Sequence, residues 1–231
     1  MSTFDVSTFN IKEFDRILAC GLSRGLGSRG QQVCVEAAIC QVLNLPHMDD
    51  PGCVARSVRS FKITLNDSSW STAKARAEGL RDLGLAQLGS KGVVEDREFT
   101  ALLSKKVVQV LIPALFREIF PNNKACLEAA LRCEQEGTEE AANSAANSAA
   151  SWAASAAASA ASWANSAARW AALETLVADP VASAARWAAM AAATAATAAL
   201  SNVDKDKYLK LGASLALGVL KELKSPGCQL L

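Results

Sequence analysis

A glycine- and arginine-rich stretch near the N-terminus is the first segment whose composition suggests chemistry. The sequence GLSRGLGSRG runs from Gly21 to Gly30 and places Arg24 and Arg29 directly before an expected helix. Backbone N–H groups at a helix start, together with guanidinium groups, can hold an anion. The stretch lacks the Lys-Ser/Thr ending of a P-loop and the strand that precedes a dinucleotide-binding turn. A plain connector is therefore the favoured interpretation, with Arg24 and Arg29 as candidate anion-binding residues.

Cys34 and His47 form a second candidate pair. Cys34 lies near the start of the expected helix, where a thiolate is favoured, and His47 is the only histidine. A thiolate beside a histidine can act as a nucleophile, so an enzyme that depends on Cys34 is one alternative. Roughly three helical turns or more separate the two residues, so their meeting in space is not implied. A buried structural cysteine and a loop histidine are favoured.

Metal and cofactor binding find little support in the sequence. One histidine and no CxxC pair lead us to expect no metal site and no cofactor. The seven cysteines are an odd number, and the first residues lack the basic and apolar regions of a secretory signal. These features predict free thiols and a cytoplasmic location. Cys228 stands fourth from the end and Leu231 last, which makes Cys228 a candidate lipidation site in a eukaryotic cytosol.

The charge balance argues against a nucleic-acid partner. The 231 residues carry 24 Lys and Arg against 23 Asp and Glu, for a net charge of +1. A nucleic-acid-binding domain usually shows a basic excess on one part of the chain. The composition is 51% hydrophobic and 20% charged, which is typical of a globular protein that buries a core.

Helical periodicity dominates residues 1–137 and predicts a compact bundle of about six helices. Pro113 marks a kink or boundary, Asn122 or Asn123 can cap the last helix, and Gly137 ends it. No run of residues shows sustained alternation of period two, so no strand is expected. The expected helices are Phe9–Leu18, Gln31–Leu43, Cys53–Leu65, Ala73–Leu88, Asp96–Phe120 and Lys124–Gln135.

Four motifs in this region resemble uncharacterised bacterial and phage-encoded proteins that join a similar all-α N-terminal region to an Ala-rich tail of variable length. The resemblance covers about residues 9–137 and implies no assigned activity or functional residue. Its motifs are CVEAAIC (34–40), LPHMDDP (45–51), AEGLRDLG (77–84) and VLIPALFREIFP (110–121).

An alanine-rich segment follows, and it is the most unusual part of the chain. Residues 141–168 comprise 16 Ala, 7 Ser, 3 Asn and 2 Trp, without any charged residue. Alanine is the strongest helix former, and Gly and Pro are absent from residues 138–179. A helix is therefore favoured over a flexible linker. The ten Ser and Asn among these 28 residues make a membrane span improbable.

The alanine-rich segment repeats every eleven residues. Ser144, Ser155 and Ser166 keep this step, as do Trp152 and Trp163. Eleven residues make about three helical turns, so the serines fall on one stripe and the alanines cover the opposite side. Pro180 interrupts the segment. We expect a helical hairpin or three-helix bundle over residues 138–224, from helices 139–178, 181–200 and 204–223, and a flexible tail over residues 225–231.

These patterns predict a non-enzymatic structural or assembly protein that works through close packing of alanine faces. Its expected partner is a second copy of the chain or another helical protein. The large side chains that would fix the register are Trp152, Trp163, Trp170 and Trp187. One alternative is an ice-binding surface, because alanine-rich helical antifreeze proteins also use eleven-residue spacing. The other is the enzyme or anion-binding module built on Cys34 and the Gly21–Gly30 loop.

Overall fold

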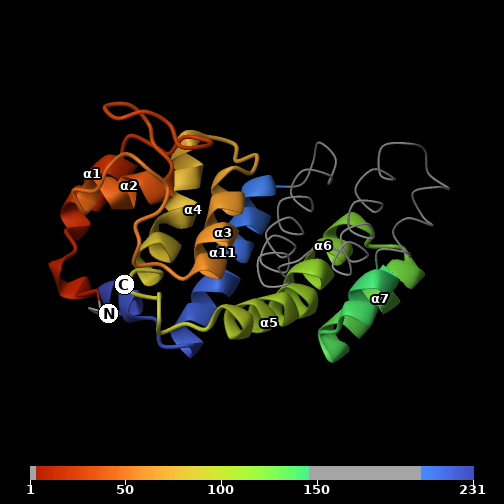
Figure 1. The fold of residues 1–231 in the computed structure, drawn as a ribbon. Helices are drawn as coiled ribbons and strands as arrows, with labels where there is room; N and C mark the ends of the chain where they lie inside the picture. The colour runs from red at the N-terminus through yellow and green to blue at the C-terminus, as the bar shows by residue number, and fades with distance from the viewer. Residues whose placement is uncertain (1–3, 146–203) are drawn as a thin grey trace.

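The chain folds into α-helices, as the sequence predicts. The computed structural model describes residues 4–145 and 204–231, and within them eight complete α-helices, the start of another at residues 139–145, and no β-strand are present (Figure 1). The all-α fold class is therefore confirmed. The elements are η1 (Val6–Thr8), α1 (Ile11–Leu18), α2 (Val35–Val42), α3 (Arg56–Asn66), α4 (Ala73–Ala86), α5 (Asp96–Lys106), η2 (Val107–Leu111), α6 (Ile112–Ile119), α7 (Lys124–Glu136), α11 (Lys205–Glu222) and η3 (Pro226–Leu230).

Helix α4 lies at the centre of the main core. It contacts α1, α2, α3 and α11, and the short helix η3 also packs against it. Figure 1 shows α3, α4 and α11 side by side, with α1 and α2 to one side of them. Leu80 and Leu83 of α4, Phe61 and Leu65 of α3, and Tyr208 of α11 are at most 1% exposed. The centre of the molecule is thus built from large apolar side chains of helices that are far apart in sequence.

Helix α11 belongs to this core, which differs from the expected domain division at residues 137 and 138. It packs against α4, α5 and α3, and its Tyr208, Leu209, Ala216 and Leu220 are fully buried there. Tyr208, Leu209 and Leu220 are bulky residues that release more free energy on burial than alanine methyl groups do. The domain that begins near the N-terminus is therefore completed by residues from the C-terminal end of the chain.

The last residues of the chain are also ordered, in place of the expected flexible tail over residues 225–231. They form η3, which closes over the C-terminal end of α4. The Ser225 hydroxyl donates to the carbonyl of Ala86 at 2.5 Å, and the Gly227 N–H donates to the carbonyl of Leu88 at 2.8 Å. Ser225 and Gly227 are buried. The backbone groups at this end of α4 gain partners that solvent would otherwise have to supply.

A long helical run from Asp96 to Ile119 contains a π-helical turn, η2, between α5 and α6. Pro113 accounts for this turn, because it has no N–H to donate to the carbonyl four residues earlier. The N–H of Ile112 bonds instead to the carbonyl of Val107, five residues back. The irregularity expected at Pro113 is therefore present directly before it.

The same run is the one described helix that is long and apolar enough to span a membrane, with a mean hydropathy of 1.5. Half of its most apolar stretch is buried inside the protein. Phe99, Leu103 and Leu111 are fully buried in the main core. The run is therefore explained as a core helix of this fold.

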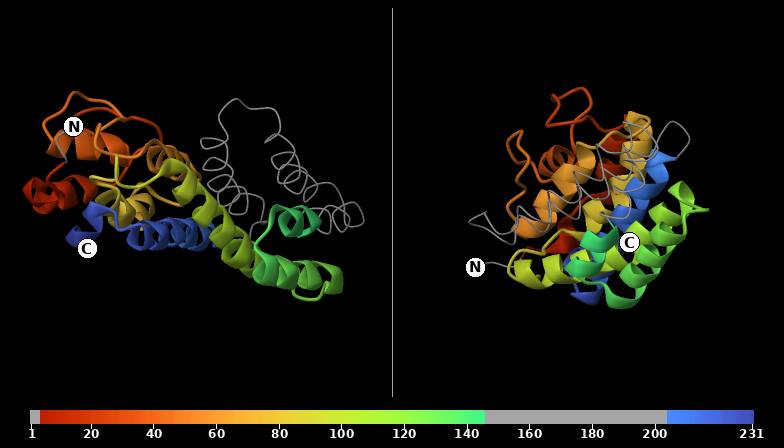
Figure 2. Two further views of the ribbon diagram at one scale, coloured as in Figure 1. Left: turned by 60° about the horizontal axis from the view of Figure 1, so that its bottom comes forward. Right: turned by 90° about the vertical axis from the view of Figure 1, so that its right-hand side faces the viewer.

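Helices α6 and α7 build a second, smaller core at the end of the molecule away from α1 and α2 (Figure 2). The rings of Phe116 and Phe120 meet edge to face with centroids 5.3 Å apart. Asn123, one of the two expected caps, accepts the N–H of Cys126 at 3.0 Å and starts α7. Gly137 ends α7 with a left-handed φ of 63°. Residues 139–145 are again helical and start the alanine-rich segment.

Candidate functional site

The Gly21–Gly30 loop covers the start of α2, and its backbone groups bond to neighbouring segments of the chain. Ser23 N–H donates to the carbonyl of Val33, and Gly27 and Val33 form an isolated β-bridge. Gly27 has a φ of +72°, and a Cβ there would lie 2.2 Å from the carbonyl oxygen of Gln32. The loop is therefore folded back tightly on the segment that leads into α2, and glycine is required at position 27.

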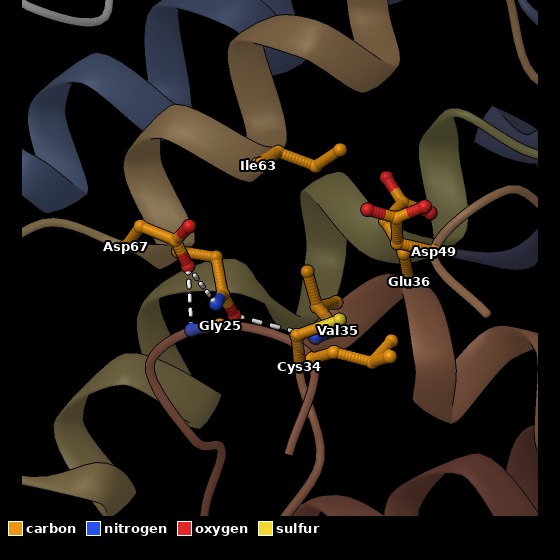
Figure 3. Close-up of a pocket in the computed structure, with 9 residues that line it drawn as sticks. Gly25, Cys34, Val35, Glu36, Asp49, Ile63 and Asp67 are labelled. Carbon is orange, nitrogen blue, oxygen red and sulfur yellow. Dashed lines mark hydrogen bonds between the residues drawn. The ribbon is translucent and has the colours of Figure 1, made fainter. Parts of the chain in front are cut away.

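The two candidate anion-binding arginines do not point to a common ligand. Arg24 is exposed, whereas Arg29 donates to the carbonyl of Leu45 at 2.7 Å. The Asp67 carboxylate accepts the N–H of Gly25 at 2.8 Å, so an acidic side chain of the protein already holds one of the loop amides (Figure 3). The loop also borders an open hollow of about 550 Å³ near Cys20. These contacts favour a connector, and anion binding stays a prediction.

Cys34 caps α2 with its thiol. The Cys34 Sγ accepts the N–H of Ala37 at 3.3 Å, and the residue is 5% exposed. Burial raises the pKa of the Cys34 thiol despite its place at a helix start. The ring of His47 instead lies 3.1 Å from the carbonyl oxygen of Gly27. The arrangement supports the structural interpretation of Cys34 rather than an activated nucleophile.

A small cavity of about 30 Å³ lies between the loop and helices α2 and α3 (Figure 3). Apolar and polar groups line it, and Asn66 organises one side by accepting the N–H of Val35 at 3.3 Å and donating to the carbonyl of Ser23 at 3.0 Å. A cavity of this size can hold about one water molecule. Its lining residues are Gly25, Leu26, Cys34, Val35, Glu36, Asp49, Ile63, Asn66 and Asp67.

Glu36 connects this cavity to a buried charged cluster that the sequence analysis did not identify. Lys62 Nζ of α3 lies 3.1 Å from Glu36 Oε1, and Gln87 Nε2 donates to Glu36 Oε2 at 3.0 Å. All three residues are 0% exposed. Burial raises the pKa of Glu36 and lowers the pKa of Lys62, so both shifts favour the uncharged forms. The cluster joins α2, α3 and the C-terminal cap of α4.

Two further cysteines share the surroundings of this cluster. Cys40 and Cys53 are buried, and burial is the main cause that raises the pKa of each thiol, to about 12 for Cys40. The nearby Glu36 carboxylate raises both values further. The two thiols are therefore held in their protonated form at neutral pH.

Comparison with known protein families, with curated proteins and with solved structures finds no match to this chain. The resemblance drawn from the N-terminal motifs therefore stays an expectation. The site must be interpreted from its own geometry. Among the described residues, no group of three or more His, Cys, Asp or Glu side chains is placed to hold a metal ion.

The remaining candidate residues divide between the two parts of the chain. The tryptophans of the alanine-rich segment, Trp152, Trp163, Trp170 and Trp187, lie outside the described residues, together with the serine stripe considered for ice binding apart from Ser144. Cys228 is described and lies in η3, where it is half-buried against the main core. Burial raises the pKa of its thiol. A lipid-transferring enzyme would have to displace η3 from α4 to reach Cys228.

Proposed function

We propose that the protein is a non-enzymatic assembly component, whose helical domain presents an alanine-rich segment for close packing against another helix. The observation that carries this proposal is the start of that segment. Ala141, Ala142 and Ala145 are between 0% and 5% exposed and pack against the core of α6 and α7. The burial of these three alanines supports a packing role for the alanine face that follows them in the sequence.

Helix α7 adds small residues to the core that these alanines join, beside the larger side chains of Phe116 and Phe120. Helix α7 contributes Ala129, Ala130 and Cys133, all buried in the same cluster. The Cys133 Sγ lies 3.4 Å from the carbonyl oxygen of Ala141, so side chain and backbone meet directly. Small side chains on both sides let two helices approach closely, and each methyl group contributes only modestly to the free energy of burial. A long contact is therefore needed for a stable association.

The alanine-rich segment is held at both of its ends by one domain. Its N-terminal end is packed on α7, and its C-terminal end leads into α11, which Asp204 caps by accepting the N–H of Lys207 at 3.2 Å. The segment is thus an insertion into the domain rather than a tail. This arrangement supports a role in which the segment is presented to a partner, proposed to be a second copy of the chain or another helical protein.

The same arrangement gives a direct test by light scattering of the purified protein. We expect a higher oligomer mass for the full chain than for a version in which a short Gly/Ser linker replaces residues 146–203. Trp163→Ala should lower the oligomer mass, whereas Trp163→Phe should largely retain it because an aromatic ring remains. An equal mass for the full chain and the linker version, with both folded by circular dichroism, would contradict the proposal.

The same two proteins also test the alternatives. Thermal hysteresis in the full chain that disappears in the linker version would favour ice binding over assembly. The proposal also includes a reducing, cytoplasmic location, as expected from the odd number of cysteines. The proposal includes no cofactor, no nucleic acid and no membrane partner.

A further inference from the structure

Glu36 contacts the amine of Lys62 and the carboxamide of Gln87, in a part of the core that solvent does not reach. Lys62 Nζ is 3.1 Å from Glu36 Oε1, and Gln87 Nε2 is 3.0 Å from Glu36 Oε2. The three side chains come from α2, α3 and the end of α4 and are all 0% exposed. One carboxyl group therefore contacts both a primary amine and a primary amide.

The polar atoms of this cluster are incompletely satisfied. Apart from the ionic contact with Glu36, Lys62 Nζ has no hydrogen-bond partner, and neither does Gln87 Oε1. Buried charges and unpaired polar atoms each cost folding free energy. A reaction that turned the amine and the amide into one neutral group would remove part of this cost.

Burial also prepares the groups for such a reaction. It lowers the pKa of Lys62 and raises the pKa of Glu36, and both shifts favour a neutral amine beside a carboxylic acid. A neutral amine has the lone pair that a nucleophile needs. A carboxyl group in contact with both nitrogen atoms can move a proton from one to the other.

We propose that Lys62 and Gln87 form an intramolecular isopeptide bond, with Glu36 transferring the proton. Lys62 Nζ attacks the Cδ of Gln87, and the Nζ–Cδ bond forms while the carbonyl electron pair moves to Oε1. Glu36 carries a proton from Nζ to Nε2. The Cδ–Nε2 bond then breaks, its electron pair leaves with the nitrogen as ammonia, and the carbonyl forms again. Glu36 is unchanged, and neither an oxidant nor another reactant is needed.

The cavity beside Glu36 offers room for the departing ammonia. It measures about 30 Å³ and is lined by Glu36 and by the polar side chains of Asp49 and Asn66 (Figure 3). Ammonia is similar in size to water, and a cavity of this volume holds about one water molecule. The product would join α3 covalently to the C-terminal cap of α4, at the end on which η3 docks.

Mass spectrometry of the full chain, reduced and denatured, tests the proposal. We expect the intact mass to be about 17 Da below the mass of the sequence, which is the mass of one ammonia. Trypsin does not cut after a lysine whose Nζ is acylated. The bridged protein should therefore give residues 60–74 joined to residues 82–91. An intact mass equal to that of the sequence, with residues 60–62 and 82–91 recovered as separate peptides, overturns the proposal.

Three variants and one control connect the mass loss to the cluster. Lys62→Met and Gln87→Met remove one reacting group each, and Glu36→Gln removes the proton carrier at nearly constant size; all three should retain the full mass. Lys106→Met changes a lysine paired with Glu222 outside the cluster and should keep the loss of about 17 Da. A cyclised asparagine also loses ammonia but leaves Lys62 open to trypsin. A loss assigned to such a residue would therefore overturn the proposal, whether or not any variant folds.

Discussion

Gly227 donates its backbone N–H to the carbonyl of Leu88 at 2.8 Å and so joins the C-terminal η3 to the end of α4. A Cβ at position 227 would lie 2.1 Å from the carbonyl oxygen of Leu85. Gly227→Ala must therefore displace η3 or α4. We expect it to lower the free energy of unfolding by about 1–3 kcal/mol, measured by urea denaturation.

Gly218 provides the matched control for this substitution. It lies inside α11, and a Cβ there would meet nothing within 4 Å. Gly218→Ala should raise the free energy of unfolding by about 0.5–1 kcal/mol, because alanine is the better helix former. If both variants unfold at the same urea concentration, the close docking of η3 is wrong.

Tyr208 provides a second test of how α11 is held in the main core. Its ring is fully buried, and its hydroxyl donates to Glu118 Oε2 of α6 at 2.6 Å. Tyr208→Phe keeps the ring and removes this hydrogen bond to a charged group, together with a longer one to the carbonyl of Ala114 at 3.3 Å. We expect a loss of about 1.5–3 kcal/mol in the free energy of unfolding, measured by urea denaturation. An unchanged midpoint would show that α11 does not meet α6 in this way.

The same carboxylate should make stability depend on pH. Hydrogen bonds from Lys207 and then from Tyr208 lower the pKa of Glu118 in the folded protein. A carboxyl group with a lowered folded pKa stabilises the protein above its unfolded pKa of about 4.3, and this contribution is lost as the pH falls through the folded value. We expect the melting temperature of Glu118→Gln to fall less than that of the wild type between pH 6 and acid pH. Parallel pH profiles would contradict this assignment.

Thiol labelling should separate structural cysteines from accessible ones. Cys20 is exposed, whereas Cys34 is buried and its pKa is raised by burial. Iodoacetamide at neutral pH should therefore modify Cys20 first and Cys34 at a rate limited by unfolding. Labelling in denaturant, where all seven cysteines should react, is the control. Rapid modification of native Cys34 would restore the interpretation of this residue as a nucleophile.

The helices themselves could be predicted because local chemistry sets their ends. The sequence indicates an irregularity at Pro113, a cap at Asn123 and a helix end at Gly137. The structure has all three, with the irregularity directly before Pro113. The partner of α11 could not be predicted in this way. Its apolar stripe shows that the helix is buried, yet a stripe carries no information about which helix it packs against. From proximity in sequence, α11 was expected to pack against the alanine-rich helices. In the structure it packs mainly against α4.

The buried cluster was missed for a related reason. Glu36 stands in the apolar run CVEAAIC and Lys62 stands on the buried face of α3, and charged residues at such positions are the signal that could have revealed them. Their pairing depends on the packing of α2 against α3, which periodicity does not specify. For Cys34, in contrast, the sequence carried a signal that the fold overrides. A helix start favours a thiolate, but in the folded protein burial outweighs it.

Helix α11 completes the main core, and this determines how the protein should respond to proteolysis. A single cut anywhere between residues 146 and 203 would separate the polypeptide into two pieces, one of which carries α11 and η3. Both of these elements are packed into the main core, against α4 and α5 in particular. The two pieces should therefore travel together through gel filtration and come apart only in denaturant, so that the nicked protein behaves as a heterodimer made from one gene product.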